Sequence, residues 1–116
     1  PILGVCLGHQ GICEVYGATI CHARQLMHGK KSTVTIDTKK TIFAGLPEKA
    51  EVARYHSLIA DIDTIPEELE VISVDENNEV MAVKHRQYDV YGLQFHPESI
   101  MTPDGMKIIE NFLNLR

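Results

Sequence analysis

Residues 1–10 read PILGVCLGHQ, a short apolar run that ends at a cysteine with one glycine two positions before it and another two positions after it. The aliphatic residues that open the run are typical of a buried strand. A helix can begin around Leu7 or Gly8, since Ile12, Val15 and Tyr16 fall at helical spacing, and Gly17 stands where a helix commonly ends in the left-handed region. The stretch therefore predicts a strand, a sharp turn at Cys6 and a helix.

Composition and charge place the chain among single globular domains. It has 116 residues, of which 44% are hydrophobic and 23% charged, with a formal net charge of -5. The absence of a basic stripe argues against binding to nucleic acid or to a membrane surface. No apolar run approaches the roughly 18 residues of a membrane span, and the pattern of a secretory leader is absent. We therefore expect a cytoplasmic protein with no nucleic-acid or membrane partner.

The three cysteines, Cys6, Cys13 and Cys21, lie close together near the start of the chain. An odd number crowded in this way fits free thiols in a reducing compartment better than a disulfide framework. Cys13 and Cys21 fall on a predicted helix and a predicted strand, so we expect them to be small core residues. Cys6 lies at the turn and is the candidate for reactivity.

After the first helix the sequence changes to short runs in which apolar and polar residues alternate. These runs predict strands at 19–22, 32–37 and 51–56. Two further runs, 70–74 and 79–84, flank four turn-forming residues and predict a hairpin. The middle of the chain is therefore mostly β.

Residues 90–95 read VYGLQF and predict one more buried strand, which leads directly into the sequence HPES. Beyond it, Thr102 is expected to cap a helix whose first turn contains Pro103 and Asp104. The expected apolar face of this helix comprises Met106, Ile109 and Leu113, with Phe112 beside it. Helices and strands together indicate an α/β domain with some antiparallel pairing.

The pattern Gly4-x-Cys6-x-Gly8 has the form of a nucleophile elbow with sulfur in place of oxygen. Such a turn is strained, and side chains at the two glycine positions are expected to collide with the packed strand and helix. A thiol at a helix start also lies near the positive end of the helix dipole, which is expected to lower the pKa of Cys6. The alternative is a buried structural thiol between two packing glycines.

A thiolate nucleophile needs a base, and the base needs an orienting partner. The sequence His96-Pro97-Glu98 offers both, because side chains at positions i and i+2 of an extended segment point the same way. Pro97 restricts both its own backbone and that of His96. The alternative is an ordinary turn followed by a helix cap.

A zinc site is the competing interpretation. Cys6 and His9, with Cys21 and His22, supply four possible ligands, but no C-x₂-C pair is present. Adjacent residues on a strand would also point to opposite faces. The remaining histidines are as compatible with structural or interface roles as with ligation; they are His28, His56 and His85.

The blocks GVCLGHQ around Cys6 and GLQFHPES around His96 resemble the two signature blocks of the class I (triad) glutamine amidotransferases, and the resemblance runs over the whole chain. It implies a flavodoxin-like open sheet with mixed strands. A nucleophile turn normally has earlier strands on either side, yet five residues precede Cys6. We therefore expect residues 1–116 to be the C-terminal portion of a glutamine amidotransferase domain, truncated before its N-terminal strands and its oxyanion loop.

By position, the resemblance makes Cys6 the nucleophile that attacks the side-chain amide of glutamine. It makes His96 the general base and acid, oriented by Glu98. A glutamyl thioester would form, ammonia would leave, and water would release glutamate. No metal and no organic cofactor is implied.

The resemblance also implies how the substrate is held. Gln10 and the segment Ser57-Leu58 would bind glutamine, and the backbone N–H of Leu7 would stabilise the oxyanion. The elbow geometry supports the role of Leu7 independently, since the amide after the nucleophile points toward the developing charge.

Three middle segments, LMHGKKS at 26–32, RYHSL at 54–58 and residues 83–105, look specifically like the glutaminase subunit of anthranilate or aminodeoxychorismate synthase. The implied partner is the large, chorismate-using synthase subunit, for which the exposed loop MHGKKS and His85-Arg86 are the candidate contacts. The alternative for each is an ordinary solvated loop. Two alternatives stay open: a glutaminase that serves another pathway, and a catalytically silent fragment that retains only partner contacts.

Overall fold

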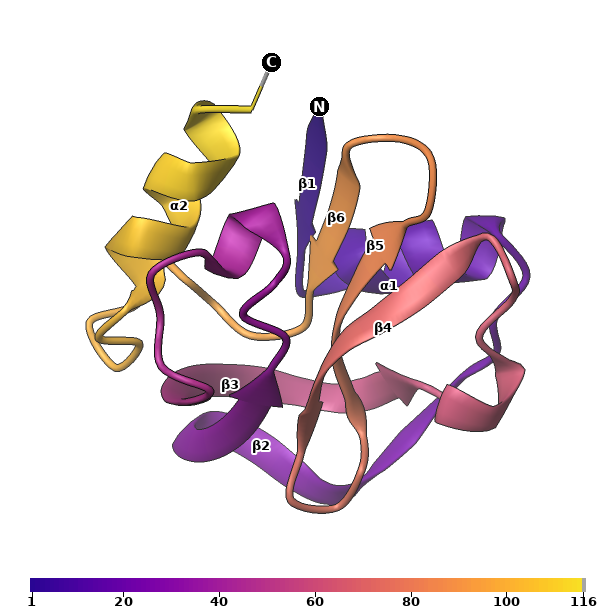
Figure 1. Ribbon diagram of the computed structural model, residues 1–116. Helices are drawn as coiled ribbons and strands as arrows, with labels where there is room; N and C mark the ends of the chain where they lie inside the picture. Colours follow the sequence, from indigo (N-terminus) through magenta and orange to yellow (C-terminus); the bar gives the residue numbers. More distant parts are fainter. Residues whose placement is uncertain (116) are drawn as a thin grey trace.

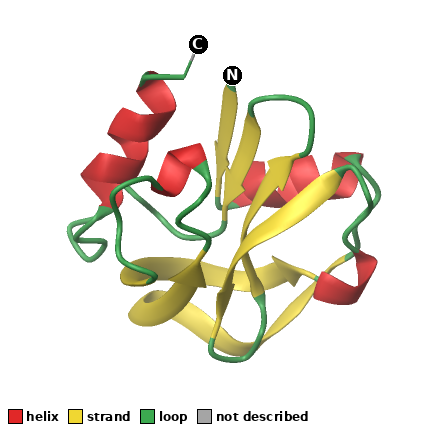
Figure 2. Cartoon of the chain, in the orientation of Figure 1, coloured by secondary structure: helices red, strands yellow, loops and turns green. Residues whose placement is uncertain are grey.

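The computed structural model describes residues 1–115, and for residues 25–30 it describes the backbone alone. Within the described residues, six strands form one sheet in the order β1-β6-β5-β4-β2-β3 (Figure 1 and Figure 2). The elements are β1 (Ile2–Val5), α1 (Leu7–Val15), β2 (Ile20–Ile36), η1 (Thr41–Phe43), β3 (Lys49–Ala60), η2 (Ile62–Thr64), β4 (Leu69–Asp75), β5 (Val80–His85), β6 (Val90–Leu93) and α2 (Gly105–Leu113). β1 pairs parallel with β6, whereas the other neighbours pair antiparallel. The predicted α/β fold with mixed strands is confirmed.

The sheet carries one α-helix on each face, and β6 shows this through its alternating residues. The ring of Tyr91 packs against Phe112 of α2, with ring centroids 6.5 Å apart. Gly92 instead faces His9 of α1, where an added Cβ would lie 2.5 Å from the imidazole. In Figure 1, α1 accordingly lies behind β5 and β6, while α2 lies beside η1.

Apolar side chains form two buried clusters. The cluster on the α2 side includes Ile42, Phe43, Tyr91, Phe95 and Ile108. The cluster on the α1 side comprises Cys13, Ala18, Ala60, Leu69, Val80 and Val83. Cys13 is fully buried, as predicted, and Cys21 is partly buried against the α2-side cluster. The two clusters pack against the same sheet, one beside each helix.

The strand-turn-helix prediction for the N-terminus is confirmed. α1 begins directly after Cys6, and Gly17 follows the helix with φ 109, in the left-handed region that glycine adopts without strain. The predicted hairpin between β4 and β5 is also present. The carboxylate of Asp75 accepts hydrogen bonds from the backbone N–H groups of Asn77 and Glu79, both at 2.9 Å, and thereby closes the turn.

Two sequence-based boundaries differ in the structure. The predicted strands 19–22 and 32–37 belong to one long strand, β2, because β3 pairs with it along most of its length despite register shifts. The last helix begins at Gly105 rather than after a Thr102 cap. Its buried face is also different: Ile108 is buried, whereas Met106 and Leu113 are 66% and 72% exposed.

No helix of the described residues is both long and apolar enough to cross a membrane.

Candidate active site

Cys6 lies between the end of β1 and the start of α1 with φ 55 and ψ -103, a conformation that costs free energy for any residue other than glycine. Its backbone N–H donates a 2.8 Å hydrogen bond to the carbonyl oxygen of Leu93, which ties the turn to β6. A Cβ at Gly4 would lie 2.7 Å from the carbonyl group of Gly8, so this glycine is required as predicted. The same expectation was wrong for Gly8, where an added Cβ would meet open space.

The thiol of Cys6 is only partly exposed. Its Sγ atom lies 3.9 Å from the carbonyl oxygen of Tyr55 on β3 and 3.8 Å from the Nε2 atom of Gln94. Burial raises the pKa of this thiol and is the largest effect, the backbone N–H of Leu7 lowers it, and the carboxylate of Glu98 raises it again. The expectation of a lowered pKa was therefore wrong for the free chain, since burial outweighs the favourable backbone contact.

The segment after β6 carries the histidine and the carboxylate. The Nδ1 atom of His96 lies 2.7 Å from the Oε2 atom of Glu98, so the two side chains form the pair that their spacing predicts. The His96 side chain is 25% exposed, and its Nδ1 atom is the one that contacts Glu98. Its ring stands edge-on to Tyr55, with ring centroids 5.2 Å apart.

Thr102 fastens this segment to β3. Its hydroxyl donates a 2.7 Å hydrogen bond to the carbonyl oxygen of His96 and accepts a 2.9 Å hydrogen bond from the backbone N–H of Ala53. The backbone N–H of His96 in turn donates to the carbonyl oxygen of Ala53. Sequence reasoning assigned Thr102 to a helix cap and missed this role, because one of its two partners, Ala53, lies on a distant strand.

Tyr55 connects the two halves of the site. Its carbonyl oxygen contacts the Cys6 sulfur and its ring contacts His96. Within the described residues no hydrogen bond joins Cys6 directly to His96, but the charge of Glu98 acts on the pKa of Cys6. The thiol and the His96–Glu98 pair therefore lie on the same side of the molecule, near the same part of β3.

A cavity of about 220 Å³ opens beside the thiol. Its lining residues are Cys6, Leu7, Gln10, Tyr55, His56, Ser57 and Leu58. Five of the seven predicted site residues line this cavity, namely Cys6, Leu7, Gln10, Ser57 and Leu58. The other two, His96 and Glu98, are not part of its lining. A second cavity of about 290 Å³ shares Leu7, Gln10 and Leu58 and extends along α1 toward Ile20.

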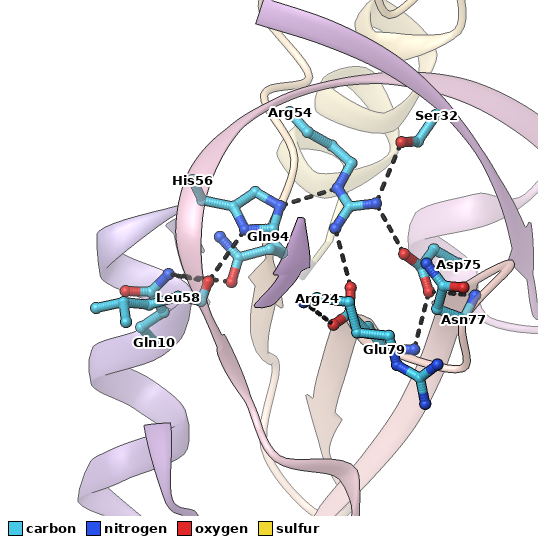
Figure 3. Close-up of polar contacts among 10 residues, drawn as sticks. All are labelled: Gln10, Arg24, Ser32, Arg54, His56, Leu58, Asp75, Asn77, Glu79 and Gln94. Atoms are coloured by element: carbon cyan, nitrogen blue, oxygen red, sulfur yellow. Dashed lines mark hydrogen bonds and ion pairs between the residues drawn. The ribbon is translucent and has the colours of Figure 1, made fainter. Parts of the chain in front are cut away.

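Beneath this cavity lies a chain of polar contacts that the sequence reasoning did not single out. The side chain of Gln10 donates to the carbonyl oxygen of Leu58 at 3.0 Å and to the Oε1 atom of Gln94 at 3.1 Å (Figure 3). Figure 3 shows that His56 and Arg54 continue these contacts toward the β4–β5 turn. The alternation in RYHSL could have indicated that Arg54 and His56 share one strand face.

The competing zinc interpretation gains no support from the described residues, among which no three His, Cys, Asp or Glu side chains converge as metal ligands would. His9 is fully buried, and burial lowers its pKa to about 4. Its ring lies 3.9 Å from the sulfur of Cys13, on the same helix. The histidine is therefore a neutral packing residue of α1.

The segments expected to contact a partner are placed differently from the prediction. MHGKKS belongs to β2 rather than to a loop, and the side chains of 27–30 lie outside the described residues. His85 is 5% exposed, and its Nδ1 atom accepts hydrogen bonds from the backbone N–H groups of Gln87 and Tyr88. His85 therefore serves the turn before β6 and is not a surface contact. Its neighbour Arg86 is exposed, as that expectation requires, and contact between Arg86 and a partner stays a prediction.

An open α/β sheet with a strained cysteine at a strand-to-helix turn defines the class of proteins built around a nucleophile elbow. Within that class, the chain belongs to the class-I glutamine amidotransferase family, whose family model matches residues 1–115.

Relatives and solved structures agree with this assignment. The chain is 50% identical over 114 residues to an aminodeoxychorismate synthase component 2 from Klebsiella aerogenes, which covers 98% of this chain and 60% of the relative. It is 47% identical over 115 residues to an anthranilate synthase component 2 from Methanothermobacter marburgensis, with 99% and 58% covered. A crystal structure from Thermoplasma acidophilum, provisionally described as part of a GMP synthase, matches with a TM-score of 0.89 at 31% identity, covering 97% and 55% of the two chains. The chain thus spans about 60% of the length of these two curated relatives.

Proposed function

We propose that this chain carries the centre of a glutaminase, which hydrolyses glutamine to glutamate and ammonia. The observation that carries the proposal is the position of Cys6: a strained, partly buried thiol that lines a cavity and lies near a hydrogen-bonded His96–Glu98 pair. Family membership supports the same conclusion, since residues 1–115 match class-I glutamine amidotransferases. We assign residues 1–116 to a single domain of this kind.

The reaction would proceed in two steps, formation of a thioester and its hydrolysis. The sulfur of Cys6 attacks the side-chain amide carbon of glutamine while its proton passes to the Nε2 atom of His96. His96 then protonates the departing nitrogen, which leaves as ammonia, and a glutamyl thioester remains. A water molecule, deprotonated by His96, attacks this thioester and releases glutamate and the thiol. Glu98 keeps the imidazole oriented throughout through its contact with Nδ1.

Residues around the cavity would hold the substrate and the developing charge. Gln10, Ser57 and Leu58 line the space beside the thiol, where a glutamine under attack by the sulfur would have to lie. The backbone N–H of Leu7 lowers the pKa of the Cys6 thiol and is suited to donate to the oxyanion. The raised pKa of the thiol implies that deprotonation is coupled to attack rather than completed beforehand.

We further propose that the ammonia is delivered to a chorismate-using synthase subunit. This proposal is supported by relatives named as component 2 of aminodeoxychorismate synthase and of anthranilate synthase, at 50% and 47% identity. The choice between these two products is left to experiment. The three free cysteines support a cytoplasmic location for this reaction.

The first test is covalent labelling with a glutamine-derived diazoketone, followed by intact-mass analysis and mapping of the adduct among the three cysteines. The proposal expects saturable labelling at Cys6 that free glutamine prevents. Equal labelling of Cys6, Cys13 and Cys21, or labelling that glutamine does not affect, would contradict it.

The partner is tested separately with a purified chorismate-using subunit of each kind. We expect the chain to enable one subunit to form product from glutamine. Without the chain, that subunit should form product only when free ammonia is supplied. The Cys6→Ala variant is the control, since it should bind the subunit without supplying ammonia. If neither subunit gains glutamine-dependent activity, the chorismate assignment is wrong.

A further inference from the structure

A buried arginine contacts His56, one of the residues that line the cavity. Arg54 of β3 is 3% exposed, and its Nη1 atom lies 2.8 Å from the Oδ2 atom of Asp75. Its Nη2 atom lies 3.5 Å from the Oε1 atom of Glu79, and its Nη1 atom also donates to the hydroxyl of Ser32 at 3.1 Å (Figure 3). A guanidinium held by two carboxylates and a hydroxyl has little freedom to reorient. The group that remains, Nε–H, therefore points in a fixed direction.

That direction leads to His56, two residues along the same strand. The Nε atom of Arg54 donates to the Nε2 atom of His56 at 2.9 Å. An arginine can only donate, so the Nε2 atom of His56 must present its lone pair, and the proton of the neutral imidazole must reside on Nδ1. Burial and then the charge of Arg54 lower the pKa of His56 to about 4, so the ring is neutral at physiological pH.

The proton on Nδ1 has an acceptor in the cavity lining. The Nδ1 atom of His56 lies 3.0 Å from the carbonyl oxygen of Leu58, which also accepts the Gln10 hydrogen bond at 3.0 Å. A carbonyl oxygen has two lone pairs, so these two donors occupy it fully. The orientation of the Leu58 peptide group is thereby determined from below by His56 and from α1 by Gln10.

Gln10 also contacts Gln94, which lies near the nucleophile. One N–H of its amide donates to Leu58 and the other to the Oε1 atom of Gln94. The Nε2 atom of Gln94 in turn lies 3.8 Å from the Cys6 sulfur. With both N–H groups engaged, the amide oxygen of Gln10 is the part left for a ligand, and an acceptor there suits an ammonium or amide N–H of the substrate.

We propose that Arg54 and His56 are positioning residues for glutamine binding: Arg54 selects the imidazole tautomer of His56, and His56 holds the Leu58 carbonyl so that Gln10 presents its amide oxygen to the substrate. This inference rests on the proposed function, because it names what keeps that same pocket in its binding geometry. Neither residue touches the reacting atoms.

Two substitutions at one position separate the two hydrogen bonds of His56. In His56→Asn, the amide nitrogen stands close to the former Nδ1 atom and can still donate to Leu58. In His56→Gln, the longer side chain places its oxygen near the former Nε2 atom, where it accepts from Arg54, and the donor to Leu58 is lost. The matched control is His85→Gln, which alters another buried histidine on β5 away from the cavity.

The readout is the concentration of the diazoketone that gives half-maximal labelling rate at Cys6, measured beside the limiting rate and the rate with iodoacetamide. We expect His56→Gln to raise the half-saturating concentration about tenfold, the effect of one hydrogen bond of ordinary strength. The limiting rate and the iodoacetamide rate should change by less than about twofold. His56→Asn and His85→Gln should retain the wild-type half-saturating concentration.

The outcomes separate the inference from the proposed function. If labelling of the wild-type chain does not saturate, the proposed function fails, and the pocket role fails with it. If wild-type labelling saturates but His56→Gln behaves like wild type, only the positioning role is overturned. Equal loss of saturation and of iodoacetamide reactivity in both His56 variants would also overturn it, because that result indicates a purely structural histidine.

The tautomer itself gives a second, independent readout. The ¹⁵N chemical shifts of the imidazole nitrogens distinguish a proton on Nδ1 from one on Nε2. We expect His56 of the wild-type chain to carry its proton on Nδ1, and Arg54→Lys, if folded, to show a mixture of tautomers with a raised half-saturating concentration. A proton found on Nε2 in the wild-type chain would overturn the inference without any activity measurement.

Discussion

The hydroxyl of Thr102 donates a hydrogen bond to the carbonyl oxygen of His96, with the two oxygens 2.7 Å apart, and at the same time accepts one from the backbone N–H of Ala53. Thr102 is 4% exposed, so water does not replace these partners. The segment that carries His96 and Glu98 is therefore attached to β3, the strand that also supplies Tyr55 to the thiol.

Replacing Thr102 with valine keeps the shape of the side chain and removes both hydrogen bonds. The buried N–H of Ala53 then has no acceptor, and we expect the free energy of unfolding to fall by about 1–3 kcal/mol. Urea denaturation measures this change. Thr102→Ser retains the hydroxyl and is the control; a Thr102→Val variant as stable as Thr102→Ser would show that the attachment contributes little.

The backbone strain at Cys6 gives a second prediction. A glycine adopts φ 55 and ψ -103 more readily than any residue with a Cβ, and it is also tolerated at the start of a helix. Cys6→Gly should therefore be more stable than Cys6→Ala by about 1–3 kcal/mol, the range found for strained backbone positions. Thermal and urea unfolding of the two variants test this difference, and equal stabilities would mean that the turn is unstrained.

Substitution by alanine should change stability in opposite directions at Gly92 of β6 and at Gly11 of α1. At Gly92 an added methyl would lie 2.5 Å from the His9 ring and 3.1 Å from Val83, so Gly92→Ala should destabilise the fold by about 1–3 kcal/mol. Gly11 lies inside α1 with open space at its Cβ position, and Gly11→Ala should stabilise the fold by up to about 1 kcal/mol. Calorimetric unfolding measures the change in stability of each variant. Changes in the same direction for Gly92→Ala and Gly11→Ala would contradict the described packing.

The buried histidine of α1 predicts a stability change in mild acid. Burial lowers the pKa of His9 from its ordinary value of 6.5 to about 4, with a smaller lowering by His56 and a partial opposing effect of the Gly92 backbone. Below pH 6.5 His9 binds a proton in the unfolded chain but not in the folded chain. The free energy of unfolding therefore falls as pH decreases toward 4. One such group contributes about 3 kcal/mol over this window.

His9→Gln removes this contribution and should reduce the slope of stability against pH between pH 6.5 and 4, whatever it does to stability at neutral pH. A smaller slope should remain, because the pKa of His56 is also lowered to about 4. Urea unfolding at several pH values measures the slope for both chains. Parallel slopes for wild type and variant would show that His9 is accessible to protons in the folded chain.

The reactivity of Cys6 should rise at unusually high pH. Burial and the Glu98 carboxylate both raise the pKa of this thiol, so the rate of alkylation by iodoacetamide should have its midpoint above the ordinary value for a cysteine. Glu98→Gln removes one negative charge and should move the midpoint to lower pH, although burial keeps it raised. Rates measured by intact mass across the alkaline range test both statements, and a midpoint that moves upward in the variant would contradict them.

Much of the candidate site could be predicted from the sequence, because its features are local. Gly4, two residues before Cys6, permits the close approach of strand and helix at the strained turn. The spacing of His96 and Glu98 places their side chains on one side of an extended segment. The turn residues before Glu79 encode the hairpin in the same way, through the hydrogen bonds of Asp75 to nearby backbone groups. Each of these depends on residues within four positions of one another.

Other features depended on contacts between distant segments, and only the tertiary structure decided them. The pKa of Cys6 is raised because the folded chain buries the thiol and brings the Glu98 carboxylate near it. Thr102 accepts a hydrogen bond from Ala53, which lies 49 residues away in the sequence. The buried face of α2 is set by the core that it meets rather than by its own pattern.

The tautomer of His56 shows the same division most clearly. The sequence RYHSL by itself determined that Arg54 and His56 share a face of one strand, since side chains alternate along β structure. It could not determine that Asp75 and Glu79, from a hairpin more than twenty residues away, would hold the guanidinium and so direct the proton of His56 toward Leu58. Alternation is a property of the local backbone, whereas burial and charge pairing exist only once distant strands have come together.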